Sequence, residues 1–395
     1  MAPAVSLSTL FWIFFKIACT SFGGFMATIS VVENVVVERK KLLSHQEMLD
    51  GISLASLLPG PVAVNVVVYV GYRLRGGLGA LISALAIVLP SLSFILILSI
   101  AYFRWGQVPA VSKLFMGFIP AMTAIIVAAA WNMSRKAIVG IREAVLAAAA
   151  AAILLGVGGF FSTLAIIFGA GIAGWLMFRG QQTPGAGPSA PAKAKVATLS
   201  AHSSLSLLTP GLVSSAVPLL SFEPHLILQV FVTFASMSLM LFGGAYVFIP
   251  LIQEIVVQGH GWVTQQEFID AVAMGQITPG PILVSAAFIG LKIAGLSGAL
   301  AATLGIYLPA ALLMVASTHM LERIRRARAI QAALRGVRPA VVGMIFAAAV
   351  VVGQTAPPVW LSIFIFVSAL FALLRFRVDA VWVIPTAGLM GWALY

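Results

Sequence analysis

The sequence has little charge and almost no cysteine. Only 9% of its 395 residues are Asp, Glu, Lys or Arg, against about a quarter in an average soluble domain. Cys19 is the single cysteine, which excludes an internal disulfide and a thiolate metal cluster. The histidines lack metal-ligand spacing, and neither a Walker sequence nor a GxSxG sequence is present. We therefore expect no catalytic residue, no metal and no cofactor.

Hydrophobic residues make up 61% of the chain. Apolar runs of about 20 residues, long enough to cross a bilayer, recur throughout the sequence. This pattern predicts an all-α polytopic membrane protein embedded in a lipid bilayer. The net charge of +12 then suggests orientation rather than nucleic-acid binding, because Lys and Arg collect in cytoplasmic loops. It also suits an anionic substrate.

The second half of the sequence repeats the first at an offset of 220 residues, which becomes 219 after one deletion. The matched motifs are Phe22-Gly23-Gly24 with Phe242-Gly243-Gly244, Pro59-Gly60-Pro61 with Pro279-Gly280-Pro281, and Pro90 with Pro309. Between the halves, the stretch from 179 to 222 begins as a Pro-, Gly-, Ala- and Ser-rich linker. We therefore predict two homologous repeats, 1–178 and 223–395, joined by 179–222.

Loop charges predict that the two repeats are inverted. The loop at 38–41 reads "ERKK", whereas its counterpart "VQGHGW" has no Lys or Arg. The later loop at 323–338 is rich in arginine only in the second half. Equivalent loops of opposite charge lie on opposite sides of a membrane, as in many secondary transporters. The expected topology has about ten spans, the first over 8–34, two re-entrant Pro-Gly-Pro hairpins, and both termini outside.

Each Pro-Gly-Pro segment follows a helix that starts with a capping box, Ser44 with Glu47 and Thr264 with Glu267. About 14 residues of helix span only about 21 Å, short of the roughly 30 Å hydrocarbon core. A second helix starting at the following proline exposes free amides that suit an anion. The candidate substrate-binding residues are Phe22, Gly23, Gly24, Pro59, Gly60, Pro61, Val62, Ala63, Asn65, Phe242, Gly243, Gly244, Pro279, Gly280, Pro281, Ile282, Leu283 and Ser285.

Ionisable residues within predicted membrane segments are candidates for function. Lys16 either binds an anion or snorkels to the outer surface. Arg73 and its counterpart Lys292 either anchor the hairpin ends at the interface or draw an anion toward them. Glu33 and Glu254 either belong to a proton relay or cap their helices at the interface. Asn65 and Ser285 are placed to hydrogen-bond an oxyanion.

The motifs "FGGFMATIS", "LPGPVAVNVVVYVGYRLRGGLGAL", "FGGAYVFIP" and "ITPGPILVSAAFIGLKIAGLSGAL" resemble those of the chromate ion transporter family. Because both halves carry them, the chain resembles the long, two-domain form. The resemblance implies secondary export of chromate across the cytoplasmic (inner) membrane of a bacterium and chromate resistance. The alternatives are a permease for sulfate or another small oxyanion and, from another class, a membrane enzyme or a channel-like scaffold. A homodimer is left open.

Overall fold

The computed structural model describes residues 5–21, 25–105, 109–157, 160–178, 223–241, 248–318, 328–354, 356, 360–376, 378 and 380–394. All the regular secondary structure in these ranges is helical. Four of the described helical stretches are long and apolar enough to cross a membrane: Val62–Trp105, Met116–Arg135, Ile282–Thr318 and Gln331–Gly353. The predicted linker 179–222 lies outside the described residues.

The helices follow the same order in both halves. The first half contains α1 (Leu7–Thr20), α2 (Phe25–Glu33), η1 (Asn34–Arg39), α3 (His45–Leu57), α4 (Val62–Trp105), α5 (Pro109–Ala137), α6 (Ile141–Gly156) and α7 (Phe160–Phe178). The second contains α8 (Pro224–Met240), α9 (Phe248–Ile252), η3 (Gln253–Gly259), α10 (Gln265–Ile277), η4 (Ile282–Val284), α11 (Ser285–Thr318), α13 (Arg328–Gly353), α14 (Trp360–Phe371), η5 (Ala372–Phe376) and α15 (Ala380–Leu394).

Helix α4 is two limbs joined by a tight turn. Gly76 has a φ of 63°, which glycine adopts readily because it has no Cβ. A Cβ on Gly79 would lie 2.2 Å from the carbonyl oxygen of Gly71, although eight residues of straight helix span about 12 Å. The chain therefore doubles back between limb 62–75 and limb 77–105. Helix α11 turns in the same way at Gly295, where φ is 61°.

The first limb of α4 pairs with α3 to form a helical hairpin whose tip is the Pro-Gly-Pro turn. An ion pair of 2.7 Å between Arg73 and Glu47 closes its open side. In the second half, Lys292 pairs with Glu267 in the same way. We call the two regions that carry these ion pairs the Arg73 end and the Lys292 end of the molecule.

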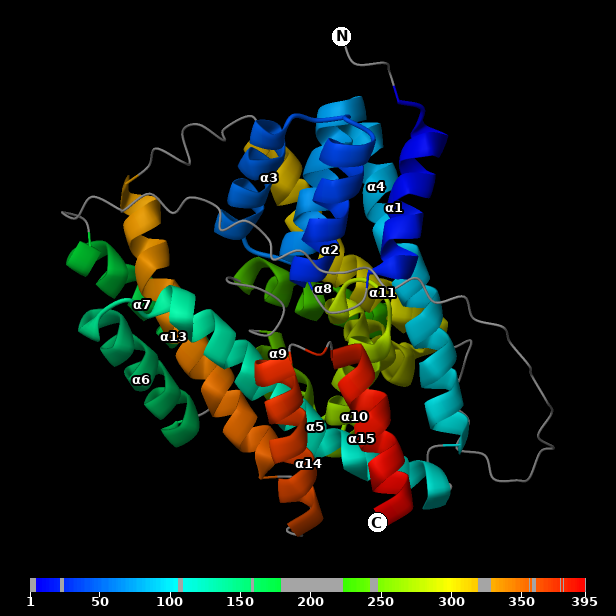
Figure 1. The fold of residues 1–395 in the computed structure, drawn as a ribbon, viewed down its shortest axis with the longest axis vertical. Helices are drawn as coiled ribbons and strands as arrows, with labels where there is room; N and C mark the ends of the chain where they lie inside the picture. The colour runs from blue at the N-terminus through cyan, green and yellow to red at the C-terminus, as the bar shows by residue number, and fades with distance from the viewer. Residues whose placement is uncertain are drawn as a thin grey trace.

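These two ends lie on opposite sides of the molecule. The second limb of α4 starts beside the Arg73 end, and the 25 helical steps from residue 77 to residue 102 span about 38 Å. There the Tyr102 hydroxyl donates to Asp270 at 2.8 Å, one turn beyond Glu267 in α10. The two hairpins therefore enter the protein from opposite ends, α3 near the top of Figure 1 and α10 in its lower part.

The predicted first span over 8–34 is wrong. It is divided into α1 and α2, and Ser21, at the end of α1, lies beside Gly280, which in turn contacts Ser91. Ser91 is halfway along the second limb of α4, 14 residues from each of its ends. In Figure 1, α1 begins near the N-terminal mark, and α2 with η1 returns toward that side, where the loop to α3 lies. Helices α1 and α2 thus form another hairpin, because the helix stops at mid-depth.

The predicted placement of both termini on one side is also wrong. The described chain starts toward the Arg73 end and finishes toward the Lys292 end, at the top and bottom of Figure 1. Helix α15 reaches the Lys292 end because Gly391 packs against Gly117 of α5, and α5 begins there after α4. The termini lie at different ends because α1 and α2 form a hairpin instead of a single span. The chain therefore starts on the same side as the loop that leads to α3.

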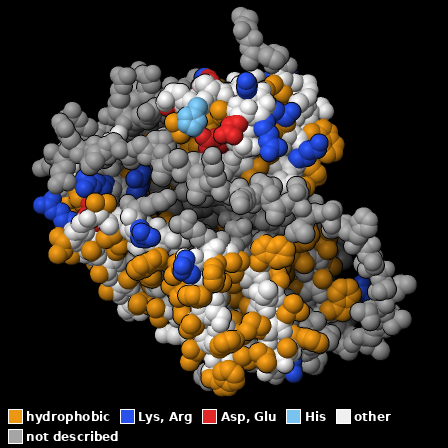
Figure 2. Space-filling view, in the orientation of Figure 1, with side chains coloured by type: hydrophobic (Ala, Val, Ile, Leu, Met, Phe, Trp, Pro, Cys, Tyr) orange, Lys and Arg blue, Asp and Glu red, His pale blue; other side chains and the backbone are white. Residues whose placement is uncertain are grey.

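The halves exchange their later helices. Helices α1–α4 pack with α8–α11, whereas α5 packs against α14 and α15, and α13 packs against α6 and α7. Figure 2 shows hydrophobic side chains over the lower part of the molecule and basic and acidic ones near its top. Exposed residues such as Phe168, Trp360 and Trp392 contribute to a surface of the kind that lipid covers.

Candidate functional site

Two reciprocal hydrogen bonds join the halves at the centre of the molecule. The amide of Gly60 donates to the carbonyl of Leu241 at 2.8 Å, and the amide of Gly280 donates to the carbonyl of Ser21 at 2.9 Å. Ser21 and Leu241 directly precede the two Phe-Gly-Gly motifs. Each Pro-Gly-Pro turn of one half is therefore bonded to the residue before the Phe-Gly-Gly motif of the other half. The motifs themselves, Phe22, Gly23, Gly24, Phe242, Gly243 and Gly244, lie outside the described residues.

Only glycine fits at the two turns. Gly60 has a φ of 108° and Gly280 a φ of 98°, which side-chain-bearing residues rarely adopt. A Cβ on Gly60 would lie 2.2 Å from the Cβ of Ala310, and a Cβ on Gly280 would lie 2.1 Å from the Oγ of Ser91. Ser91 and Ala310 are equivalent positions of the repeat. Each turn therefore packs against the equivalent position of the other half.

The proline carbonyls of the turns are satisfied differently in the two halves. Asn65 donates through Nδ2 to the carbonyl of Pro59 at 3.2 Å, within its own half. The equivalent carbonyl, that of Pro279, accepts from the Oγ of Ser91 in the other half at 2.6 Å. The difference follows from the sequence, because Ser285 replaces Asn65 and Ala310 replaces Ser91.

A helix starts directly after each turn, with its N-terminus at the centre of the protein. The amide of Asn65 donates the first α-helical hydrogen bond, to the carbonyl of Pro61 at 3.0 Å. The amides of Val62 and Ala63 precede this bond and have no partner within the helix. In the second half, Val284 donates to Pro281 O at 3.2 Å, which leaves Ile282 and Leu283 in the equivalent position. All of these residues are buried, so the amides supply positive partial charge inside the protein.

Two buried polar atoms beside the turns have no hydrogen-bond partner: the Oγ of Ser21 and the Oδ1 of Asn65. The Ser21 hydroxyl can donate to an oxyanion. Asn65 Oδ1 only accepts, so it suits water or another donor, because the amide nitrogen already bonds Pro59. Orphaned buried polar atoms of this kind point to a site that takes up a polar ligand or water.

Sequence reasoning missed Ser21, Ser91 and Tyr307 as residues of this site. Tyr307 donates through its hydroxyl to the carbonyl of Pro281 at 3.4 Å. A signal existed for two of them, since Ser21 directly precedes a Phe-Gly-Gly motif and Ser91 directly follows the repeated Pro90. Their contacts run between the halves, however, and the offset of the repeat carries no information about such contacts.

The basic residues singled out from the sequence lie away from the turns. Lys16 is exposed on α1, on the side that also exposes Trp12 and Thr20. Arg73 and Lys292 are both engaged in ion pairs at the open sides of the hairpins. The structure therefore places Arg73 and Lys292 at the open sides of the hairpins and Lys16 on the exposed surface of α1, and none of the three contacts a Pro-Gly-Pro turn.

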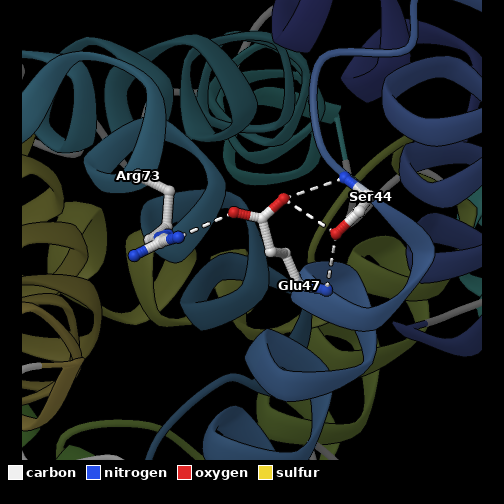
Figure 3. A network of polar contacts seen from close by, with 3 residues as sticks. All are labelled: Ser44, Glu47 and Arg73. Atoms are coloured by element: carbon white, nitrogen blue, oxygen red, sulfur yellow. Dashed lines mark hydrogen bonds and ion pairs between the residues drawn. The ribbon is translucent and has the colours of Figure 1, made fainter. Parts of the chain in front are cut away.

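The Arg73–Glu47 ion pair is part of a helix cap (Figure 3), and the Lys292–Glu267 pair is built in the same way. Glu47 accepts from the backbone amide of Ser44 at 2.9 Å and from Arg73 at 2.7 Å. These two bonds hold the pKa of Glu47 below its ordinary value. Burial opposes ionisation of Glu267, but bonds from Lys292 and the Thr264 amide outweigh it and lower the pKa of Glu267. Both predicted capping boxes are present.

Glu33 and Glu254 lie on the returning helices, away from the turns. A Glu33 oxygen lies 3.1 Å from Nδ1 of His45, whereas the equivalent contact in the second half is neutral and joins Gln253 to Gln265 at 3.1 Å. Glu254 follows Gln253 in η3 and is partly buried. Their role in proton transfer stays a prediction.

Within the described ranges, no three His, Cys, Asp or Glu side chains come together as metal ligands. A small pocket between α5, α9, α10 and α13 is lined by side chains that offer no hydrogen-bond donor: Met122, Ile126, Ile249, Phe268, Ile269, Val272 and Val352. The central turns, with their amides and orphaned polar atoms, are therefore the stronger candidate for an anion site.

Broken helices that meet inside a bundle of two related halves define a class of multi-pass helical membrane proteins in which ligands bind at the breaks. Comparison with known families agrees, since the chromate transporter family matches residues 8–175 and 228–392. The chain belongs to the chromate transporter family, a family of transporters and not of enzymes.

Three relatives match most of the chain. It is 30% identical to a probable chromate transport protein of Synechococcus elongatus, over 89% of this chain and 86% of the relative. It is 29% identical to a chromate transport protein of Cupriavidus metallidurans, over 89% and 84%. It is 28% identical to a chromate transport protein of Pseudomonas aeruginosa, over 100% and 94%. No solved structure matches the chain.

Proposed function

We propose that this protein is a secondary transporter that exports chromate across the cytoplasmic (inner) membrane and thereby confers chromate resistance. The single observation that carries the proposal is the reciprocal bonding of the two Pro-Gly-Pro turns, Gly60 to Leu241 and Gly280 to Ser21. It brings two helix N-termini, together with Ser21 and Leu241, to one central region. Membership in the chromate transporter family supports chromate as the anion.

The chemistry of the centre suits a doubly negative oxyanion. Amides of Val62, Ala63, Ile282 and Leu283 lie at helix starts, where the helix dipole favours negative charge. The Ser21 hydroxyl adds a donor that has no partner. Partial charges of this kind bind an anion without a fixed countercharge, so that the anion can also leave, as a transport cycle requires.

We further infer an inverted repeat, with 1–178 and 223–395 as its halves and 179–222 as the connection. The hairpins of the two halves enter from opposite ends, as inversion requires. Exposed Arg39, Lys40 and Lys41 and the Arg73–Arg75 turn lie toward the Arg73 end, so the positive-inside rule places this end in the cytoplasm. The α1–α2 and α3–α4 hairpins are then both re-entrant from the cytoplasm, and their counterparts are re-entrant from outside.

Transport by this architecture follows from alternate opening of the two ends. The central turns are the tips of two hairpins of equal construction, one from each end of the molecule. Rocking of one half against the other around the Gly60 and Gly280 contacts would open one approach while the other stays closed. The driving force is an ion gradient or the membrane potential, since the sequence carries no nucleotide-binding motif.

The direct test measures accumulation of labelled chromate in cells that express the protein and in cells that do not. We expect lower accumulation in expressing cells, and no difference between empty cells and cells expressing Gly280→Leu at matched membrane levels. Equal accumulation with and without the wild-type protein would remove chromate export as its function.

A sulfate permease is the second candidate, because amides and a hydroxyl recognise any tetrahedral dianion of similar size. Purified protein in liposomes separates the two. Sulfate in excess should inhibit labelled chromate uptake weakly if chromate is the substrate, and labelled sulfate itself should be transported more slowly. Faster transport of sulfate than of chromate would favour the permease.

A further inference from the structure

Asp270 is a buried carboxyl at the contact between the two halves. It lies in the second turn of α10, is 1% exposed, and accepts hydrogen bonds from Tyr102 of α4 at 2.8 Å and from Gln266 at 2.9 Å. Tyr102 belongs to the first half and Asp270 to the second. The bond therefore joins α10 of the second half to α4 of the first half.

The repeat contains a natural comparison for this site. Asp50, the equivalent residue, also accepts from the glutamine four residues earlier, Gln46, at 3.2 Å. Asp50 is only half-buried, and the position equivalent to Tyr102 is Leu321. Burial of the carboxyl thus distinguishes Asp270 from Asp50, although the fold is repeated.

The surroundings of Asp270 favour exchange of a proton. Burial disfavours the ionised carboxyl, whereas donation from Tyr102 and Gln266 favours it, so the two effects oppose each other. Glu267, one turn earlier, carries a negative charge that adds to the first effect and is itself paired with Lys292. The described residues of the elements packed against α10 carry these further titratable or charged groups: Tyr69, Tyr72, Arg73, Arg75 and Arg104 of α4, Lys113 and Arg135 of α5, Tyr307 of α11 and Glu254 of η3.

We propose that Asp270 is a proton-binding site, and that its protonation weakens the Tyr102 bond and so couples proton binding to separation of the halves. A neutral carboxyl is a weaker acceptor than a carboxylate, so the bond between halves loosens when the proton arrives. The proton enters from the Lys292 end, past Tyr102, which is partly exposed. The coupling to anion transport rests on the proposed function; the proton binding itself does not.

Proton binding is tested on the full-length protein in liposomes by infrared titration of the carboxylic acid C=O band. We expect a band that grows as the pH falls, that disappears in Asp270→Asn and that is unchanged in Asp50→Asn. In Tyr102→Phe the midpoint of the band's titration should move to higher pH, because the carboxylate loses a hydrogen-bond donor. An unchanged band in Asp270→Asn, or an unshifted one in Tyr102→Phe, overturns the proton site.

Coupling is tested by chromate-induced proton movement, followed with a pH-sensitive dye inside the liposomes. We expect proton movement in the wild type and in Asp50→Asn. In Asp270→Asn we expect none, together with retained exchange of internal for external chromate, which needs no net proton transfer. Proton movement that survives in Asp270→Asn, or loss of the exchange as well, overturns the coupling. A wild type that titrates but moves no chromate leaves the proton site standing and contradicts only the proposed function.

Discussion

Gly280 and Ser91 meet so closely at the centre of the protein that a Cβ on Gly280 would lie 2.1 Å from the Oγ of Ser91. The contact joins a turn of the second half to a long helix of the first. Its counterpart joins Gly60 to Ala310. Both turns are therefore held by the opposite half, and substitutions there test the contact and the site together.

We expect Gly60→Ala and Gly280→Ala each to abolish most transport and to lower stability. The backbone conformation costs a residue with a Cβ about 1–3 kcal/mol, and overpacking adds about 1–3 kcal/mol. Gly77→Ala is the matched control, because a Cβ there meets nothing within 4 Å. Melting temperatures in detergent and chromate uptake by liposomes measure the two effects. Wild-type behaviour of both turn variants would contradict the close contact.

Ser91→Ala should destabilise the protein by about 1–3 kcal/mol, the usual effect of leaving a buried carbonyl without its donor. The carbonyl concerned is that of Pro279, which accepts from Ser91 at 2.6 Å. Ser93→Ala is the control, since Ser93 is exposed and bonds only the carbonyl of Leu89 in its own helix. Thermal unfolding of the two variants should differ clearly. Equal melting temperatures would show that the bond between the halves contributes nothing.

Glu47 should give the protein a stability that depends on pH. The pKa of Glu47 is lowered in the fold by the Ser44 amide and by Arg73, so the carboxylate stabilises the fold above pH 4.5, the ordinary value for glutamate. This contribution is lost as the pH falls through the lower pKa of the folded state. Glu47→Gln keeps a capping side chain but removes the charge.

The difference in melting temperature between wild type and Glu47→Gln is the measurement. At neutral pH we expect only a small difference in melting temperature. It corresponds to a difference of about 0.2–1 kcal/mol in the free energy of unfolding, because the Arg73 pair is half-exposed. The difference should shrink toward zero in acid. A difference that is constant from neutral to acid pH would show that the carboxylate charge is not the cause.

Labelling of two equivalent exposed positions tests the inverted arrangement. Lys40 and His260 follow η1 and η3 in the two halves and have almost the same backbone conformation, with φ of −98° and −96°. In a Cys19→Ser background, a membrane-impermeant maleimide should label Lys40→Cys only from the cytoplasmic side and His260→Cys only from outside. Labelling of both from one side would exclude the inversion.

Much of the local structure could be predicted from the sequence. The capping boxes at Ser44 and Thr264 form as expected, because a cap depends on residues three positions apart. The helices also break at the Pro-Gly-Pro turns, because proline and glycine act on their own backbone. By contrast, 8–34 has the length and hydrophobicity of a span, and only its position relative to Ser91 reveals that the helix stops halfway.

Residues that join the halves were the least accessible to sequence reasoning. Ser21, Ser91 and Tyr102 are ordinary residues of apolar helices until their partners in the other half are known. Asp270 and Asp50 look alike in the repeat, yet one is buried against a tyrosine and the other is half-exposed. A repeat predicts what the halves share, whereas these contacts depend on how the halves meet.

The order of the residues alone determined that the chain is helical, apolar, doubled and interrupted at matching places, because periodicity, caps and prolines act over a few positions. Only the tertiary structure decided that each interruption is bonded to the other half, that the first hydrophobic stretch turns back, and that one of two equivalent carboxyls is buried. Those outcomes depend on packing between segments roughly 200 residues apart, and no local preference of the chain encodes it.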